Sequence, residues 1–440
     1  MYRIVFFLFL IVLSFNSFAQ EKVTSKEVEE YALKLYQNKE WGKLYKFSDK
    51  AIKQGFDYFY LRQRAGEACF YMKNYRKAIV HLKEALAYNN EDVNANYFMY
   101  YSLLFSGRTF DANQFVKNKS SYIKEAVGYE KQKLFSNINI TSGPTISDTK
   151  NKMENIDIDG TDNISGNALV YENTFNTSIG LKHDVFSWLS VFHSFSMLNL
   201  NQNSYTSANN LQQLNSDKIR QYQYYFTIPT RVANGLIFIP FANIIAFQNY
   251  EFTTTIGRRN EIVINKNLIT SYFNVFGGKF SKEIRNFTIQ ASFIKGNLLG
   301  SNQTQIGLSL YYFPLGNTKL YFKGKTDYYT EDNSSRFINT VSASCNITKK
   351  IIVNGTYYFG DITHFIDDEG YVVNNAIDKS LSMFNFSINY LLNKKTNLFL
   401  AYNFNERQGL YNNTKTNNIT INNYYKYTNQ TIIGGLKWNF

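Results

Sequence analysis

Three of the four histidines, His183, His193 and His364, are the side chains best suited to proton transfer or to activating a nucleophile. Residues two positions apart in a strand point the same way, so a serine that works with one of these histidines along a strand must stand at that spacing. The residues at that spacing are apolar in every case: Leu181 and Val185, Val191 and Phe195, and Ile362 and Ile366. We therefore predict no catalytic residue and no enzyme.

Two acidic clusters are the remaining candidates for chemistry. His364 stands near Asp361, Asp367 and Asp368, a combination that a protease could use, but a solvated acidic loop is the favoured interpretation. Asp157, Asp159 and Asp162 could bind Ca²⁺, but the position of Gly160 does not match an EF-hand loop. We predict no metal site and no cofactor.

The composition excludes several protein classes. The chain has 440 residues with 38 Phe, 35 Tyr, 3 Trp and only 4 Pro, and its mean hydropathy is −0.33. This apolar content excludes a disordered or collagen-like chain. Past the N-terminus the sequence has no apolar run of about 18 residues, the length that a spanning helix needs. The 47 basic residues exceed the 34 acidic ones but form no cluster that indicates nucleic acid.

The N-terminus has the pattern of a secretory signal peptide. A basic start at Arg3 precedes an apolar stretch from Ile4 to Phe15, and small residues occupy Ser17 and Ala19. We predict cleavage after Ala19, so that 1–19 is the signal peptide. The two cysteines, Cys69 and Cys345, fall in different predicted domains, which argues against a disulfide.

Residues 20–132 are predicted to form an α-helical solenoid. Charged residues are about twice as frequent in 21–133 as in the rest of the mature chain. Three pairs of residues are spaced by 34: Trp41 and Tyr75, Ala51 and Ala85, and Ala78 and Ala112. In the middle unit Gly66, Ala78 and Ala85 provide small side chains where helices approach closely, beside Tyr75 and Leu82.

This pattern resembles tetratricopeptide (TPR) repeats, in about three units of which the outer two are degenerate. An unrelated helical bundle is the alternative. The resemblance implies a concave surface that binds a periplasmic protein or peptide, and it does not identify the partner.

From residue 133 onward the apolar residues alternate with a period of two. Phe384, Phe386, Ile388 and Tyr390 alternate with Asn385, Ser387 and Asn389. One apolar and one uncharged polar face suit a wall between lipid and water. We expect about 14 strands (range 12–14) in 133–440, joined alternately by short turns and by long loops at 144–167, 201–217, 250–267, 362–378 and 407–425. Such a barrel has its short turns in the periplasm, which places both of its ends there.

Several residues have expected places in this barrel. Pro240 lacks a ladder donor and should cause a bulge or a break in its strand. The pairs Tyr311 and Tyr312, Tyr357 and Tyr358, and Tyr424 and Tyr425 should form interfacial aromatic girdles. Tyr321, Lys323 and Lys325 should face the lumen and give some anion preference. The last strand places on one face Ile432, Gly434, Leu436, Trp438 and Phe440, which resembles the C-terminal signal that the barrel insertion machinery recognises.

The whole chain resembles the Bacteroidetes outer-membrane β-barrel proteins that carry an N-terminal periplasmic TPR domain. The resemblance implies a Gram-negative integral outer-membrane protein that contacts lipid and lipopolysaccharide, to which the acidic loops could bridge through divalent ions. The leading hypothesis is a non-enzymatic envelope component whose helices bind a periplasmic partner while the barrel anchors it or passes cargo in assembly, secretion or export. A passive channel or small-solute transporter is the alternative, and a surface-exposed barrel hydrolase is the third.

Overall fold

The chain is described from a computed structural model that defines residues 24–153, 163–208, 211–256, 262–298, 300–332, 334–374, 378–415 and 419–440. It divides into two compact units, one ending at Met99 and the other running from Tyr100 to Phe440. The change from helix to strand occurs between Ala126 and Phe135, beside the predicted boundary at 132. The predicted signal peptide and the Asp157, Asp159 and Asp162 cluster lie outside the described residues.

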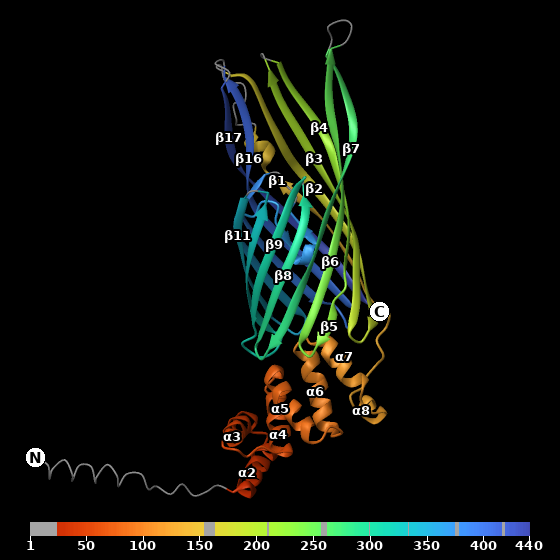
Figure 1. Cartoon of the computed structure of the whole chain (residues 1–440), viewed down its shortest axis with the longest axis vertical. Coiled ribbons are helices and arrows are strands. Elements are labelled where there is room, and N and C mark those ends of the chain that lie inside the picture. Colours follow the sequence, from red (N-terminus) through yellow and green to blue (C-terminus); the bar gives the residue numbers. More distant parts are fainter. Residues whose placement is uncertain are drawn as a thin grey trace, which may run out of the picture. The chain divides into compact units, whose positions relative to one another are not determined.

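Helices occupy the described chain before the first strand (Figure 1). Thr24 caps the first of them, because its hydroxyl accepts from the Glu27 amide while the Glu27 carboxylate accepts from the Thr24 amide, a capping box. None of the helices in the described part of the chain is both long and apolar enough to cross a bilayer. The helices are α2 (Ser25–Gln37), α3 (Trp41–Lys53), α4 (Phe59–Tyr71), α5 (Tyr75–Tyr88), α6 (Val93–Phe105), α7 (Thr109–Lys117) and α8 (Ser121–Ala126).

The helices recur every 34 residues along the sequence, as the residue spacing predicts. The helices α2, α4 and α6 begin 34 residues apart, and so do α3, α5 and α7. Lys39, Lys73 and Gly107, also 34 apart, have φ of 56°, 62° and 84° and end the first helix of each pair in the left-handed region. Helical pairs at this spacing are therefore a property of the structure, while their assignment to the TPR family stays a prediction.

The predicted repeat positions lie in helix contacts. A Cβ atom on Gly66 of α4 would stand 2.5 Å from the Cγ of Leu82 on α5, so the two helices approach too closely there for a larger residue. Trp41 of α3 stacks on Tyr71 of α4 with ring centroids 4.5 Å apart. Buried at these positions are Ala51, Gly66, Ala78, Leu82, Ala85 and Ala112, while Trp41 and Tyr75 are half-buried.

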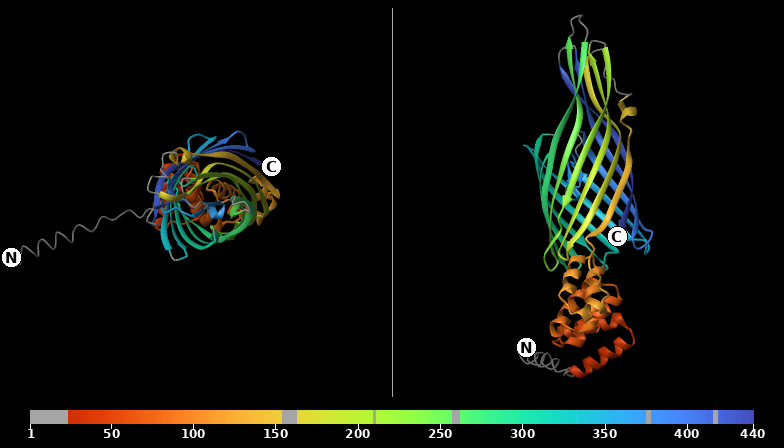
Figure 2. Two further views of the ribbon diagram at one scale, coloured as in Figure 1. Left: turned by 90° about the horizontal axis from the view of Figure 1, so that it is seen from above. Right: turned by 90° about the vertical axis from the view of Figure 1, so that its right-hand side faces the viewer.

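Fourteen antiparallel strands close into a barrel in the second unit (Figure 2, left). The last strand pairs with the first, with Trp438 opposite Ile138, so the barrel wall has no free edge and both of its ends lie at one rim. The short strand β5 (Thr230–Ala233) continues β4, and the helix α9 (Thr149–Met153) follows β1. The wall strands are β1 (Phe135–Ser147), β2 (Asn163–Phe186), β3 (Leu189–Ala208), β4 (Leu211–Thr227), β6 (Leu236–Ile256), β7 (Ile262–Ile284), β8 (Phe287–Leu298), β9 (Ser301–Tyr312), β10 (Leu320–Glu331), β11 (Ser334–Asn346), β12 (Ile351–Gly360), β15 (Lys379–Leu391), β16 (Thr396–Lys415) and β17 (Thr420–Asn439).

The barrel wall is uneven in height (Figure 1). The strands β8 to β12 and β15 have 10 to 13 residues, close to the roughly 9–11 that span a bilayer. The strands β2, β3, β4, β6, β7, β16 and β17 have 17 to 24 residues and rise beyond them. The prediction of long loops over 201–217, 250–267 and 407–425 is therefore wrong in large part, because most of these residues extend the strands as tall hairpins.

The two faces of the wall differ as the alternation predicts. Large apolar residues such as Phe276, Leu308 and Leu310 are exposed on the outward face, whereas Asn243 and Gln305 are buried on the inward face. In each tyrosine pair predicted to form a girdle, alternation sends one ring outward and the other inward. The outward rings are Tyr312, Tyr357 and Tyr424, and their place in a girdle stays a prediction.

Pro240 lies within a continuous strand, so the interruption predicted at this position falls in the neighbouring strand instead. Its carbonyl accepts from the Ile228 amide at 3.0 Å, which shows that the side of Pro240 without an N–H faces β4 and β5. That ladder is interrupted between Thr227 and Thr230, where Pro240 cannot donate. On its other side β6 pairs regularly with β7, with Pro240 opposite Gly278.

Candidate functional site

The connection between β12 and β15 runs inside the barrel. The sequence predicts an outer loop over 362–378, and this prediction is wrong. Gly360, with φ of 111°, ends β12, and the chain then forms the small hairpin β13 (Ile366–Asp367) and β14 (Val372–Val373) around the turn η2 (Asp368–Gly370). We call the described residues 361–374 of this connection the lumen segment. Its contacts are with the inward faces of strands all around the wall.

Apolar contacts hold one side of the lumen segment. Ile366 joins a buried cluster with residues from β4, β6, β7 and β8, against which Tyr371 and Val373 also pack. Gly370 lies against the ring of Phe241, and a Cβ atom there would meet the ring at 2.8 Å. Gly370 also has φ of 84°, so both its conformation and its contact require glycine. Burial of these apolar side chains against the wall removes their surface from water, and this stabilises the lumen segment inside the barrel.

Hydrogen bonds fix the backbone of the lumen segment. The side-chain amides of Asn243 and Gln305 donate to the carbonyls of Gly370 and Ile366, each at 2.9 Å. The Tyr329 hydroxyl donates to the carbonyl of His364 at 3.1 Å. Backbone groups that leave a sheet must find other partners, and here inward side chains of β6, β9 and β10 supply them.

Ion pairs fix the charged side chains of the lumen segment. Lys279 of β7 forms an ion pair with Glu369. Lys325 of β10 stands between Asp327 at 2.9 Å and Asp367 at 3.4 Å, and Asp367 also accepts from the Tyr358 hydroxyl. Sequence reasoning missed Lys279 and Glu369 as partners because they are separated by 90 residues.

All three residues predicted to line the lumen have partners there, and the ring of Tyr321 packs against those of Tyr311 and Phe313. Tyr321, Lys323 and Lys325 lie on the inward face of β10, alternating with the exposed Phe322. Lys323 stands 5.3 Å over the ring of Tyr311, and Lys325 is paired with two carboxylates. The charge of Lys325 is therefore balanced by Asp327 and Asp367.

His364 is not brought together with the aspartates near it in the sequence. Its Nδ1 lies 2.6 Å from the Glu331 carboxylate of β10, and Glu331 also pairs with Arg336 of β11. Asp361 binds Lys379 and Thr363 instead, and Asp367 binds Lys325. The acidic partner of His364 is therefore a strand residue 33 positions away, which a local motif search does not find.

A cavity of about 440 Å³ remains beside the tip of the lumen segment. Glu369 and Tyr371 of the lumen segment line it together with residues of β1, β3, β4, β15, β16 and β17. The lining combines aromatic rings with uncharged amides, and its charged members are Glu369 and Lys437. The lining residues are Asn139, Thr141, Phe192, Tyr225, Thr227, Glu369, Tyr371, Asn389, Asn397, Phe399, Leu436 and Lys437.

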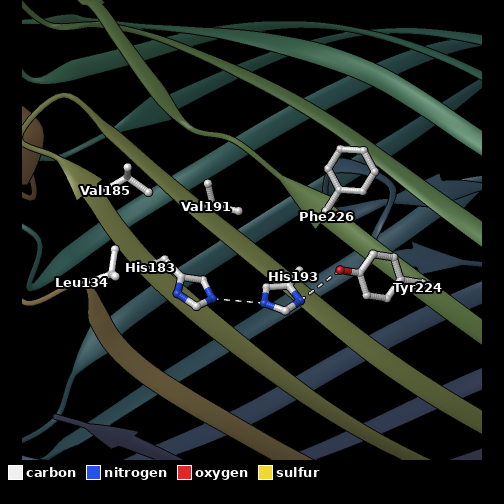
Figure 3. Close-up of a pocket in the computed structure, with 7 residues that line it drawn as sticks. All are labelled: Leu134, His183, Val185, Val191, His193, Tyr224 and Phe226. Carbon is white, nitrogen blue, oxygen red and sulfur yellow. Dashed lines mark hydrogen bonds between the residues drawn. The ribbon is translucent and has the colours of Figure 1, made fainter.

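A second polar site lies on the outward face, near the rim that holds both barrel ends. His183 of β2 and His193 of β3 approach with their Nε2 atoms 3.1 Å apart, and the Tyr224 hydroxyl of β4 lies 3.2 Å from the Nδ1 of His193 (Figure 3). Reasoning along single strands missed this pair. The sequence does contain a signal for the pair. The strands β2 and β3 form a hairpin around Ser187 and Trp188, and two residues nearly equidistant from such a turn become neighbours across the hairpin. Among the described residues, no group of three or more His, Cys, Asp or Glu could hold a metal ion.

Comparison with known proteins adds the following. No protein-family model and no curated protein matches the chain. The chain is a β-barrel of the outer-membrane type, by its even strand number, apolar outward face and closed wall. The Pseudomonas putida toluene transporter TodX and a Pseudomonas aeruginosa FadL homologue are each 7% identical, with a TM-score of 0.42 over 69% of this chain and 90% of theirs. An anion-selective porin from Comamonas acidovorans is 11% identical, with a TM-score of 0.30 over 70% of this chain and 99% of its own. At these identities and TM-scores the similarity carries no argument about function.

Proposed function

We propose that the barrel is an outer-membrane channel for small solutes and that the lumen segment narrows it. The observation that carries the proposal is the course of the lumen segment inside the wall, anchored by Lys279, Lys325, Asn243 and Gln305 and leaving a cavity beside its tip. A segment with no role in passage would not need ion pairs and buried contacts with the inner wall. For the barrel, this proposal takes the alternative of a passive channel in place of the leading hypothesis, in which the barrel anchors a periplasmic partner or passes its cargo.

The lining favours small polar solutes without a strong charge preference. Amides of Asn139, Asn389 and Asn397 face aromatic rings such as Tyr371 across the cavity. Amides donate and accept hydrogen bonds, and aromatic rings cover apolar surface. The lining can therefore replace the contacts that a polar solute makes with water. Lys325 is neutralised by its two carboxylate partners, which argues against the anion preference inferred from sequence.

The test is conductance of the full-length chain in planar lipid bilayers. Because β12 and β15 pair directly up to Tyr358 and Met383, a short Gly-Ser-Gly linker can replace residues 362–377. We expect this variant to conduct several-fold more than the wild type, because the constriction is gone. Heat-modifiable migration on gels verifies that each variant has folded as a barrel.

A matched control removes a similar length of chain from outside the lumen. Replacement of 251–267 by the two-residue turn Asn-Gly shortens the hairpin of β6 and β7 to the pair of Tyr250 and Leu268 and keeps the register below that pair. This variant should conduct as the wild type does. A folded lumen-segment deletion that conducts no more than the wild type would contradict a solute path through the lumen.

We also propose that the barrel ends and the helical unit lie in the periplasm and that the helices bind a protein segment there. Support comes from the short turns at the rim of the barrel ends and from the 34-residue recurrence of the helices. Binding of a protein segment by the helices is tested by replacing the exposed Tyr60 or Tyr88 with a photo-crosslinking residue in intact cells. We expect a discrete crosslinked protein, and the absence of crosslinks at both positions would contradict partner binding by this surface.

A further inference from the structure

The histidine pair on the outward barrel face is exceptional for its position. In the register of β2 and β3, His193 is opposite Leu181 and His183 is opposite Val191, so the two histidines are diagonal neighbours on one face. That face is the outward one, because it also carries the exposed Ile179 and Phe195. Polar side chains on an apolar outward face carry a cost that a specific interaction must offset.

The two imidazoles are directed toward one another. Their planes differ by 14°, their centroids are 5.3 Å apart, and the two Nε2 atoms face each other at 3.1 Å (Figure 3). The contact is a hydrogen bond in which one Nε2 carries the proton and the other accepts it with its lone pair, and the tautomer of each ring decides which is the donor. Two convergent nitrogens are the minimum of a chelating site.

The surroundings leave room and offer no competing charge. The histidines open into a surface pocket of about 440 Å³ that is otherwise lined by Leu134, Val185, Val191, Tyr224 and Phe226. None of these lining residues is charged. The pocket therefore has no cation that would repel a bound metal ion, and no carboxylate that would hold the imidazoles in ion pairs. The pocket lining is uncharged because side chains alternate along the strand, and charged neighbours such as Lys182 and Asp184 therefore point to the opposite face.

We propose that His183 and His193 form a binding site for a divalent transition-metal ion of borderline softness, such as Zn²⁺, Cu²⁺ or Ni²⁺. Imidazole is a preferred ligand of these ions. With metal–nitrogen bonds of about 2.0–2.1 Å, two nitrogens lie about 2.9 Å apart at a right angle and about 3.4 Å apart in a tetrahedron. The observed 3.1 Å falls between these values. An ion bound to both rings would lie off the line between the two Nε2 atoms. The rings would turn from their hydrogen-bonded orientation, the shared proton would leave for Nδ1 or for water, and water would complete the coordination.

Tyr224 acts as a positioning residue in this site. Its hydroxyl lies 3.2 Å from the Nδ1 of His193, on the side of the ring away from the proposed ion. When Nδ1 carries the proton and donates it to the phenol oxygen, Nε2 is the lone-pair nitrogen and the ring orientation is fixed. Partners of this kind typically contribute a factor of about 10 to 100 to metal affinity.

The other histidines provide matched controls. His364 lies on the lumen segment with its Nδ1 engaged by Glu331. His81 is buried in the helical unit, and burial lowers its pKa to about 4. Neither takes part in the contact between His183 and His193, so each offers a single imidazole.

The experiment measures ion binding to the full-length protein in detergent after treatment with EDTA. Titration calorimetry with ZnCl₂ should show one saturable ion per chain, and electron paramagnetic resonance with CuCl₂ should show two coordinating nitrogens. His183→Ala and His193→Ala should each weaken binding at least tenfold, and Tyr224→Phe about tenfold. His364→Ala should bind as the wild type does. Heat-modifiable migration verifies that every variant is a folded barrel.

Three results would overturn the proposal. One is the absence of saturable binding to the folded wild type. Another is equal affinity in the wild type and in both His→Ala variants, which would place the ion elsewhere on the chain. The third is a copper spectrum with a single coordinating nitrogen, because the proposed site requires both rings.

Discussion

Glu67 is a buried carboxyl group in α4 of the helical unit, with the Tyr36 hydroxyl donating to it at 2.8 Å. Burial raises the pKa of Glu67 to about 7 from its ordinary value of 4.5, against the opposing effect of the Tyr36 hydrogen bond. Between these two values the folded chain binds more protons than the unfolded chain does, so the free energy of unfolding falls as pH rises. The ionised form is the one that the fold disfavours.

The variant Glu67→Gln should abolish this pH dependence, because its amide carbonyl still accepts from Tyr36 and never ionises. We expect the variant to be more stable than the wild type at pH 8 by up to about 3 kcal/mol and close to it at pH 4. Thermal unfolding followed by circular dichroism at 222 nm measures the difference. The lowered pKa of His81 makes the free energy of unfolding rise with pH between about 4 and 6.5, opposite to the effect of Glu67. His81 is present in both proteins, so the wild type and the variant are compared at the same pH. A gap that does not widen with pH would contradict the assignment.

Gly66 tests the close helix contact that the repeat pattern predicts. The variant Gly66→Ala places a Cβ atom 2.5 Å from the Cγ of Leu82 and should lower the free energy of unfolding of the helical unit by about 1–3 kcal/mol. Gly42→Ala is the matched control, since no atom lies within 4 Å of the added Cβ in α3. The control should stabilise the helix by about 0.5–1 kcal/mol, the usual gain of alanine over glycine. Equal effects of the two variants would argue against a close approach at Gly66.

At the scale of elements, Asp111 joins the helix α7 to the barrel rim within the second unit. Its carboxylate lies 2.5 Å from the Nε of Arg231, 2.7 Å from Arg108 and 3.1 Å from the Gly235 amide, and it is buried. Asp111→Asn leaves two arginines with a neutral partner and should cost about 3–5 kcal/mol at this contact. Hydrogen exchange of residues 109–126 should rise, whereas Asp49→Asn, in the exposed pair with Lys53, should leave exchange in α3 nearly unchanged. Unaltered exchange in the Asp111 variant would show that this contact does not hold the helix.

The ion pair of Lys279 and Glu369 tests the lumen segment as an element. Glu369→Gln weakens the attachment of the tip to β7, and single-channel recordings should show more frequent or larger openings, roughly a two- to tenfold gain in open time for a loss near 1 kcal/mol. Glu406→Gln is the control, because Glu406 pairs with Lys426 at an exposed place on the barrel wall. A channel that responds equally to both variants would not be gated by the lumen segment.

At the scale of the whole molecule, the last strand closes the barrel. On its outward face are the exposed Ile432, Leu436, Trp438 and Phe440, with Gly434 between them, and the strand pairs with both β1 and β16. The combined substitution of Trp438 and Phe440 by Ala should reduce the amount of heat-modifiable barrel in membranes at least several-fold, as expected of an insertion signal. Trp188→Ala, at a turn on the same rim, should not. Normal assembly of the double variant would remove the basis for assigning a signal to these residues.

Periodic features of the whole molecule were predictable from sequence. All fourteen wall strands lie where alternation places them, and the helices recur at the predicted spacing, because each follows from residues close together along the chain. Strand ends were less predictable. Residues 201–208 and 407–415 continue their strands although their alternation is weak. They are strands because backbone hydrogen bonds within a tall hairpin pair them, which does not require an apolar face.

By itself, the sequence determined that this chain has helical pairs followed by a closed barrel with an apolar outward face. Only the tertiary structure decided that the lumen segment enters the barrel, because that course depends on Lys279, Lys325 and Asn243 from strands distant in sequence. It also decided that His183 meets His193 and that His364 meets Glu331. Local periodicity fixes which way a side chain points, whereas strand register and closure fix what it meets.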